Sequence, residues 1–483
     1  MFNEFSNLTQ KQSYILLLSA CILSRLATSI FYIEDIDSLR FALSIEDYDI
    51  SKLQPHFPGY PVFCFIAKIL FLIIGSKAAS FSIIGGVSVF AIIYFILKIS
   101  KIEINNRIGI FCSFIIFFNP IIWLMSNRYM PDLMGLAIAV ACMYYLTDKS
   151  NNTKNLIYGY IFIGLLVGVR LSYVPLIIIP FIFHLIKNDQ RFYLFLSCCG
   201  GCLVWLIPLI YITGYENLYL AASKQTIGHF TDFGGTVLTD NNIYYRSLKL
   251  IRSIWADGLG GYWSGRAWQT GFLSISYAYF LYLGYIGSRK YLKYDKSFVM
   301  IIYCIVLYTL WIFFFQNVIY KTRHILPILI IVFMLVTIGH KYISEPKAII
   351  YNTFVGAFFI ALVTVTFTLV NQHKNPTAVS RLKDSIVLGH NNGTIISTPL
   401  INYYMKRHGV QSDFINVEDE GQISRLNSSE KEEALVIGNF QGLFENNYSI
   451  KTETTYFHNP YVNRMWPRID TYRLYKNSDV IKE

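Results

Sequence analysis

The chain has 483 residues, of which 54% are apolar, 17% are aromatic and only 15% are charged. This composition excludes an ordinary soluble protein, and repeated apolar runs of bilayer-crossing length indicate a polytopic membrane protein. The formal net charge is +11 at pH 7, but Lys and Arg lie mostly in short segments between the apolar runs. Membrane orientation therefore explains the charge, and we expect no nucleic-acid binding.

All eight cysteines lie in apolar segments, so the sequence contains no disulfide framework. Three of them occur in Cys198-Cys-Gly-Gly-Cys202, a spacing that a metal site could use. Because Leu, Phe and Val flank this run within an expected helix, we interpret it as a helix–helix contact of small residues. We interpret the first apolar segment as a retained anchor, because no small-residue cleavage site follows it.

The apolar runs predict a series of membrane spans, beginning with residues 14–33 and with the N-terminus inside. A stretch at 62–75 is too short to cross and is interpreted as a partial or interfacial helix, and a full span follows at 78–97. Residues 156–186 fit two short helices that meet at Arg170. Further spans are expected at 108–125, 133–147, 192–212, 271–287, 297–315, 325–339 and 348–370, which gives about 11 to 12 transmembrane segments.

The positive-inside rule leaves four loops on the external side: 34–61, 126–132, 213–270 and 316–324. After a membrane domain at 1–370, residues 371–483 are polar and contain no spanning run. We expect a small soluble α/β domain on the external side there. Its expected strands are 394–397, 434–437, 449–456 and 471–475, and its expected helix is 400–407.

The first external loop is the most informative stretch of the chain. It places six carboxylates within sixteen residues and then closes on a Pro-rich element that contains His56. Carboxylates at a membrane surface must be solvated, paired or catalytic, because burying them unpaired is costly. The acids are Glu34, Asp35, Asp37, Glu46, Asp47 and Asp49, of which we interpret Glu46 and Asp47 as solvated.

The other external segments add mainly cations to this face. They are Arg128 and Asp132 in the second loop, Arg170 at the half-helix junction, and Lys321, Arg323 and His324 in the loop at 316–324. Arg and Lys side chains can hold a phosphate leaving group, and a carboxylate can take the proton from an attacking hydroxyl. The combination is typical of group transfer from an anionic lipid.

Each of these residues also has a structural interpretation. Arg170 among apolar helices requires a partner or a function, and Asp132 could simply cap the helix that starts at Pro131. Lys321 and Arg323 could be interfacial anchors, and His56 could only brace its loop.

The first loop resembles the corresponding loop of GT-C glycosyltransferases that use polyprenyl-phosphate sugars, such as protein mannosyltransferases and aminoarabinose transferases. The similar motifs are Glu34-Asp-Ile-Asp-Ser-Leu-Arg-Phe-Ala-Leu43, Tyr48-Asp49 and Pro55-His-Phe-Pro-Gly-Tyr-Pro61. Looser similarities follow at Arg128–Asp132, Gly164–Arg170, His229–Gly235 and Arg323–Pro327. The resemblance covers about residues 14–340, and the C-terminal domain carries no motif of the family.

The resemblance implies an inverting transfer from a polyprenyl-phosphate sugar to a hydroxyl acceptor on the outer face. Asp37 would be the general base, with Asp35 as the alternative, and Asp132 would help to orient acceptor or base. Arg170, Lys321 and Arg323 would stabilise the departing lipid phosphate. The remaining candidates for substrate binding are Glu34, Asp49, His56, Arg128, His229 and His324. No cofactor is expected, although a divalent metal is compatible with clustered carboxylates.

Two other functions are compatible with a polytopic chain of this kind. A transporter or flippase of lipid-linked saccharides would place ionisable residues near mid-membrane, whereas the acids here cluster at one surface. An O-antigen polymerase or ligase would use large Arg-rich external loops without this acidic first loop. The abundance of Asn, Ile, Lys and Tyr suggests a bacterial inner-membrane enzyme, for example a glucosyltransferase that modifies lipopolysaccharide O-antigen.

Overall fold

The computed structural model describes residues 8–148, 152–343, 349–389, 393–421, 423, 433–444 and 448–476. The chain forms two compact units: Met1–Phe31 with Arg40–Asn371, and Tyr32–Leu39 with Gln372–Glu483. The division near residue 371 lies where the sequence places it. The short segment Tyr32–Leu39, which the sequence assigns to the membrane domain, instead belongs to the second unit.

Among the described residues, the regular secondary structure of the first unit is helical, with one isolated β-bridge between Asp49 and Gln54. Its helices are α1 (Gln10–Ala27), α2 (Ile36–Glu46, which begins in the second unit), α3 (Pro61–Ile74), α4 (Lys77–Ser100), α5 (Arg107–Phe117), α6 (Pro120–Asn127), α7 (Asp132–Thr147), α8 (Thr153–Arg170), α9 (Ile178–Lys187), α10 (Arg191–Thr213), α11 (Tyr215–Thr231), α12 (Ile243–Arg252), α13 (Gln269–Tyr294), α14 (Lys296–Phe315), α15 (Ile328–Ile343) and α16 (Ile349–His373). Shorter turns are η2 (Ile50–Lys52), η3 (Leu171–Leu176), the π-helical η4 (Ser253–Gly258) and η5 (Thr322–Ile325).

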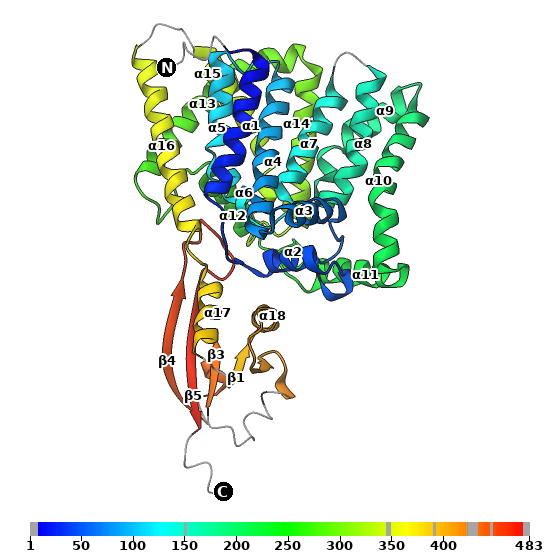
Figure 1. The fold of residues 1–483 in the computed structure, drawn as a ribbon. Helices are drawn as coiled ribbons and strands as arrows, with labels where there is room; N and C mark the ends of the chain where they lie inside the picture. The colour runs from blue at the N-terminus through cyan, green and yellow to red at the C-terminus, as the bar shows by residue number, and fades with distance from the viewer. Residues whose placement is uncertain are drawn as a thin grey trace. The chain divides into compact units, whose positions relative to one another are not determined.

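Five helices in the described part of the chain are long and apolar enough to cross a membrane, or six if the bent pair α5–α6 counts as one span. The five are α4, α8 with η3, α10, α14, and α16 together with the helix that follows it, Ile349–Leu388. Figure 1 shows α1, α4 and α7 side by side, and the contacts between these helices agree with it. The protein is therefore a multi-pass membrane protein, while the expected number of 11 to 12 segments stays a prediction.

The segment at 62–75 forms α3, a helix of only 14 residues that lies crosswise to α1 and α4 in Figure 1. Pro61 occupies its first turn, and Gly75 ends it with a φ of 75°. Proline suits the first turn because no backbone partner is needed there, and glycine tolerates a positive φ. The chain thus turns out of α3 and starts the full-length α4 two residues later.

The span expected at 108–125 is not one continuous helix, because the chain divides there into α5 and α6, a bent pair with an angle of 55° between its helices. Asn119 caps α6 through its side chain, which accepts a hydrogen bond from the amide of Ile122. Pro120 follows at the first helical position, where its ring excludes a continuous helix. The Asn119 amide also donates to the carbonyl of Gly258, at 2.7 Å, so the break is held by a distant segment.

The segment from Cys198 to Cys202 lies in α10 and forms part of the contact between α10 and α8. A Cβ added at Gly164 would lie 2.5 Å from the carbonyl oxygen of Cys198, and one at Gly201 would lie 2.5 Å from that of Ile161. Only glycine permits so close an approach of two backbones. The small-residue interpretation of this run is therefore confirmed.

The long loop expected at 213–270 is instead largely helical, comprising α11, α12 and η4. Arg246 of α12 is fully buried and ties this region to the end of α14. Its guanidinium donates to the carbonyl oxygens of Phe313, Gly235 and Gln316. Carbonyls at a helix C-terminus have no partner within the helix, and a cation satisfies them well.

We expect Arg246→Met to destabilise the folded protein by about 3 kcal/mol, because it removes a charged donor from several buried carbonyls. Thermal unfolding of the purified protein in detergent measures the effect. The matched control is Lys249→Met on the same helix, whose amine lies 5.0 Å from the Tyr245 ring. Equal melting temperatures for the two variants would contradict the expectation.

The second unit is an α/β domain with a five-stranded sheet. Its elements are α17 (Ala378–Leu388), β1 (Thr394–Ser397), α18 (Pro399–Arg407), β2 (Asp413–Asn416), β3 (Glu433–Ile437), β4 (Tyr448–Phe457) and β5 (Arg468–Lys476). The strand order is β2-β1-β3-β5-β4, with β2, β1 and β3 parallel and β5 and β4 antiparallel. Ile396, Val436, Phe444 and Leu474 lie in its core. The expected strands and helix are all present, whereas α17 and β2 were not anticipated.

Candidate functional site

A buried ion pair joins the start of α7 to the end of α8. Asp132 is the first residue of α7, Arg170 is the last of α8, and Arg170 Nη2 lies 2.8 Å from Asp132 Oδ1. The two side chains are only 1% and 6% exposed. A Cβ added at Gly135 would lie 2.6 Å from Arg170 Cβ, so the two helices touch beside the pair. Charges this deeply buried require a partner, and each supplies it to the other.

Two further segments that the sequence predicts to be external reach the same pair. Arg323, in η5, places its Nε 3.8 Å from Asp132 Oδ1, so one carboxylate oxygen faces two guanidinium groups. Arg170 Nη1 lies 3.5 Å from the hydroxyl of Tyr60, which also contacts His56 Nε2 at 3.1 Å. We refer to Tyr60, Asp132, Arg170, Arg323 and His324 as the buried charge cluster. Three of the four predicted external loops and the predicted half-helix junction thus meet at one place.

His324 is the neutral member of the buried charge cluster. Burial lowers the pKa of its imidazole well below the ordinary value, and the nearby cations Arg170, Arg323 and Lys321 lower this pKa further. His324 therefore remains uncharged at neutral pH. Its Nδ1 is buried and has no hydrogen-bond partner among the described residues, so the ring can still bind a ligand through that nitrogen.

This lowered pKa predicts a pH dependence of stability. The unfolded chain binds a proton at His324 below about pH 6.5, whereas the folded chain does not, so this histidine weakens the fold as the pH falls. We expect His324→Gln to lose less thermal stability than the wild type between about pH 7.5 and about pH 5.5. Melting curves at the two pH values measure this. Parallel losses in both proteins would argue that His324 is protonated in the folded state.

Helix α2 carries the acidic motif of the first loop. Asp35 precedes its first turn and accepts a hydrogen bond from the amide of Ser38 at 2.8 Å, which caps the helix. Asp37 is in the first turn and is 3% exposed. Phe41 follows Asp37 by four residues and so lies on the same face of the helix. The Phe41 ring packs against Tyr60, with centroids 5.0 Å apart.

Glu34 and Asp35 take part in a second buried network, within the second unit. Glu34 accepts from His373 Nε2 at 2.8 Å and from Asn463 Nδ2 at 2.7 Å. The same Asn463 amide lies 3.2 Å from Asp35 Oδ2. Thr377 donates to the backbone oxygen of Glu34. These bonds hold the segment Tyr32–Leu39 against the C-terminal part of the chain and explain why it belongs to that unit.

Three of the other predicted site residues have local structural partners. Asp49 Oδ1 accepts from the backbone and side chain of Ser51 and thereby caps η2. His229 contacts the carbonyl of Phe315 at 2.6 Å, at the end of α14. Arg128 Nη1 contacts Met125 Sδ at 3.7 Å. These contacts position the segments that carry the three residues.

Sequence reasoning missed Arg25, a fully buried arginine in α1. Its guanidinium carbon lies 3.9 Å from the Trp123 ring, and Nη2 donates to the carbonyl of Phe117 at 2.7 Å. Phe117 ends α5, so Arg25 satisfies a carbonyl that the break before α6 leaves without a helical partner. The sequence signal that could have identified Arg25 is the presence of an arginine within an apolar run. Tyr60, His373 and Asn463 were also missed, and only Tyr60 lies in a motif that the sequence singled out.

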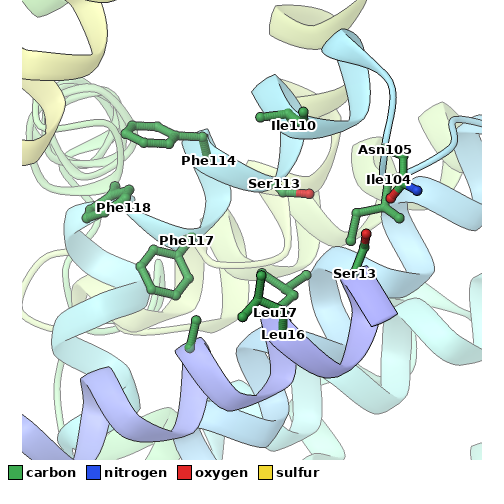
Figure 2. A pocket seen from close by; sticks show the side chains of 11 residues that line it. Ser13, Leu16, Leu17, Ile104, Asn105, Ile110, Ser113, Phe114, Phe117 and Phe118 are labelled. Carbon is green, nitrogen blue, oxygen red and sulfur yellow. The ribbon is translucent and has the colours of Figure 1, made fainter. Parts of the chain in front are cut away.

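The described residues contain no group of three or more His, Cys, Asp or Glu side chains that could hold a metal. They do contain an apolar groove of about 240 Å³ between α1 and α5. Figure 2 shows Leu16 and Leu17 of α1 on one side and Phe114, Phe117 and Phe118 on the other. Its lining includes no residue of the buried charge cluster.

The sequence matches no protein-family model and no curated protein. Its structure does resemble solved structures. ArnT from Cupriavidus metallidurans bound to undecaprenyl phosphate is 9% identical with a TM-score of 0.56, and the match covers 95% of this chain and 97% of that one. ArnT in the apo state gives 10% identity and the same TM-score over 96% and 98%.

The oligosaccharyltransferase from Archaeoglobus fulgidus tethered with an acceptor peptide is 11% identical with a TM-score of 0.47, over 95% of this chain and 75% of that one. At such identities a match establishes the fold alone. The two ArnT matches extend over almost the whole of both chains, and they agree with the helical membrane unit and the small C-terminal sheet. The chain therefore has the GT-C fold.

Proposed function

We propose that the protein is a membrane glycosyltransferase that moves a sugar from a polyprenyl phosphate to a hydroxyl acceptor. The observation that carries this proposal is the buried charge cluster in a GT-C fold. In the cluster, one carboxylate oxygen faces Arg170 at 2.8 Å and Arg323 at 3.8 Å. Holding two guanidinium groups together in a buried site is costly unless an anion uses them. A lipid phosphate is such an anion, and ArnT is described with one bound.

The transfer proceeds in one displacement. The acceptor oxygen forms a bond to the anomeric carbon while the bond from that carbon to the phosphate oxygen breaks. The phosphate leaves with the bonding electron pair, and Arg170, Arg323 and Lys321 stabilise its growing negative charge. The acceptor proton passes to a carboxylate base. The configuration of the sugar is inverted, because a single displacement occurs.

Asp37 is the carboxylate that best fits the role of base. Both oxygens of Asp35 already accept hydrogen bonds, one from Ser38 and one from Asn463. Protonating Asp35 would therefore weaken a helix cap and a buried network. Asp37 lies in the first turn of α2, is 3% exposed, and stands at the position of the first-loop motif where the resemblance implies the base. Asp132 then serves as a positioning residue that orients the two guanidinium groups.

Neutral His324 adds a hydrogen-bond donor or acceptor for the phosphate or the sugar. We assign the reaction to the external face of a bacterial inner membrane, where a surface polysaccharide such as lipopolysaccharide O-antigen offers hydroxyl acceptors. The chemistry requires no metal, because the cations supplied by the chain suffice for a monophosphate leaving group.

The test is sugar transfer by the purified protein in lipid vesicles. Polyprenyl-phosphate glucose, mannose and aminoarabinose are supplied in turn together with a glycan acceptor that offers free hydroxyls, and release of polyprenyl phosphate is measured against protein-free and acceptor-free vesicles. The matching nucleotide sugars serve as control donors. Release from at least one lipid donor, with none of the nucleotide sugars consumed, supports the proposal. A folded protein that uses no lipid donor, or that uses a nucleotide sugar, overturns it.

A further inference from the structure

The second unit contains a polar cavity of about 630 Å³ whose lining includes no residue predicted for the site. Its volume falls within the range of about 300–1,000 Å³ that is typical of ligand pockets. All its lining residues belong to the second unit, and they include Thr398, Asn439, Gln441, Trp466, Asp470 and Tyr472.

The sheet topology explains why a cavity forms here. Thr398 directly follows β1, and Gly438 directly follows β3. From β1 the chain passes through α18 to β2 on one side, while β3 pairs with β1 on the other side. Adjacent parallel strands whose connections diverge leave a crevice at their carboxyl ends, and α/β domains bind ligands in this crevice.

We propose that this cavity binds a sugar residue of the acceptor glycan. That the bound glycan is the acceptor of the transfer rests on the proposed function. Sugars present a C–H face that packs on aromatic rings and a rim of hydroxyls that bond to amides and carboxylates. The cavity offers aromatic surface from Trp466 and Tyr472 together with side-chain oxygens from Asn439, Gln441 and Asp470. Gln441 Oε1 is buried and has no hydrogen-bond partner among the described residues, so it can accept from a ligand hydroxyl.

The charges of the cavity disfavour a phosphate or a nucleotide. Arg468 lines the cavity, but its Nε lies 3.1 Å from both oxygens of Asp470, which neutralises its charge. The turn from β1 into α18 reads Ser397-Thr398-Pro399, without the glycines that let a backbone approach a phosphate. Pro399 also removes one amide donor from the start of α18. A neutral polar ligand fits this balance better than an anion.

Trp466 adds an independent sign that the cavity is built for a ligand. Its φ is 50°, a left-handed conformation that is a genuine outlier for a bulky residue. Such strain persists where a side chain must point in a particular direction, and it is common at ligand sites. Its ring lies 6.3 Å from that of Tyr404, which orients the indole at the cavity wall.

The experiment measures sugar binding by the full-length protein in lipid nanodiscs, which carry no sugar head group. Saturation-transfer NMR is recorded with the methyl glycosides of glucose, galactose, rhamnose and N-acetylglucosamine, and with inorganic phosphate and adenosine monophosphate as competitors. The variant Trp466→Gly removes the aromatic surface while keeping a residue that accepts the positive φ. Its folding is checked by its melting temperature. Tyr475→Ala, a partly exposed aromatic on β5, is the matched control.

We expect at least one glycoside to bind, with about tenfold weaker binding in Trp466→Gly and unchanged binding in Tyr475→Ala. Equal binding by the wild type and Trp466→Gly would overturn the inference, and so would displacement of the sugar by phosphate or adenosine monophosphate. If Trp466→Gly fails to fold, Gln441→Leu serves as the second test variant, and it must also weaken glycoside binding. Release of polyprenyl phosphate in the transfer assay tests the proposed function separately, because it does not require glycan binding in this cavity.

Discussion

Asp37→Asn is expected to lower sugar transfer by about 10²- to 10⁴-fold at equal membrane abundance, because a positioned general base contributes a factor of this size. Asparagine keeps the shape of the side chain but cannot take the acceptor proton. Asp37 is only 3% exposed, so the melting temperature of the variant is measured alongside transfer to separate a loss of folding from a loss of the base. Donor binding should change little, because the proposed function assigns the phosphate to Arg170 and Arg323.

Two carboxylates of the same loop give matched controls for this experiment. Asp47→Asn alters an exposed acid that pairs with Lys52 at 2.9 Å, and it should leave transfer unchanged. Asp35→Asn weakens the cap of α2 and should cost about 1 kcal/mol of stability with a smaller loss of activity. Full activity in Asp37→Asn, with loss in Asp35→Asn, would move the base to Asp35.

Asp132→Asn has the largest expected effect on the folded protein. It leaves two buried guanidinium groups facing an uncharged amide, and removing one partner of a buried pair costs about 3–5 kcal/mol. We expect a lower melting temperature, lower membrane abundance and little transfer. Measurements of abundance and transfer on the same membranes separate the two effects.

The double variant Asp132→Asn with Arg170→Gln distinguishes a structural pair from a functional one. Removing both charges should restore part of the stability lost in Asp132→Asn, because one unpaired cation is gone. Transfer should remain lost, because Arg170 no longer stabilises the phosphate. Recovery of transfer together with stability would mean that the pair serves only to hold α7 against α8.

The sequence predicts the apolar helices well, because bilayer-length apolar runs and flanking Lys or Arg are local signals. The prediction fails where contacts between residues far apart in the sequence determine the structure. The break at Asn119–Pro120 interrupts an apolar run of ordinary spanning length, although proline was a visible warning. The helices α11 and α12 occupy a segment whose length and polarity suggest a loop, and their position depends on Arg246 bonds to α14.

For the candidate site, sequence patterns predict which residues matter better than what they contact. Asp132, Arg170 and Arg323 stand out as charges at the ends of apolar segments, and the structure brings them together. The motif around His56 identifies its loop as a candidate site from the sequence alone. The contact of Tyr60 with Arg170, in contrast, forms only in the folded chain. No local pattern links Glu34 to His373 and Asn463, which lie 339 and 429 residues away.

That long separation sets an order of events during biosynthesis. At about 5–20 residues per second, roughly 20–90 s pass between the synthesis of Glu34 and that of Asn463. The acidic segment Tyr32–Leu39 is made among the first parts of the chain, yet its hydrogen-bond partners emerge almost last. A ribosome that stalls or stops before Asn463 leaves spans in the membrane without an assembled acidic segment. Assembly of this segment with its partners therefore waits until Asn463 has been made.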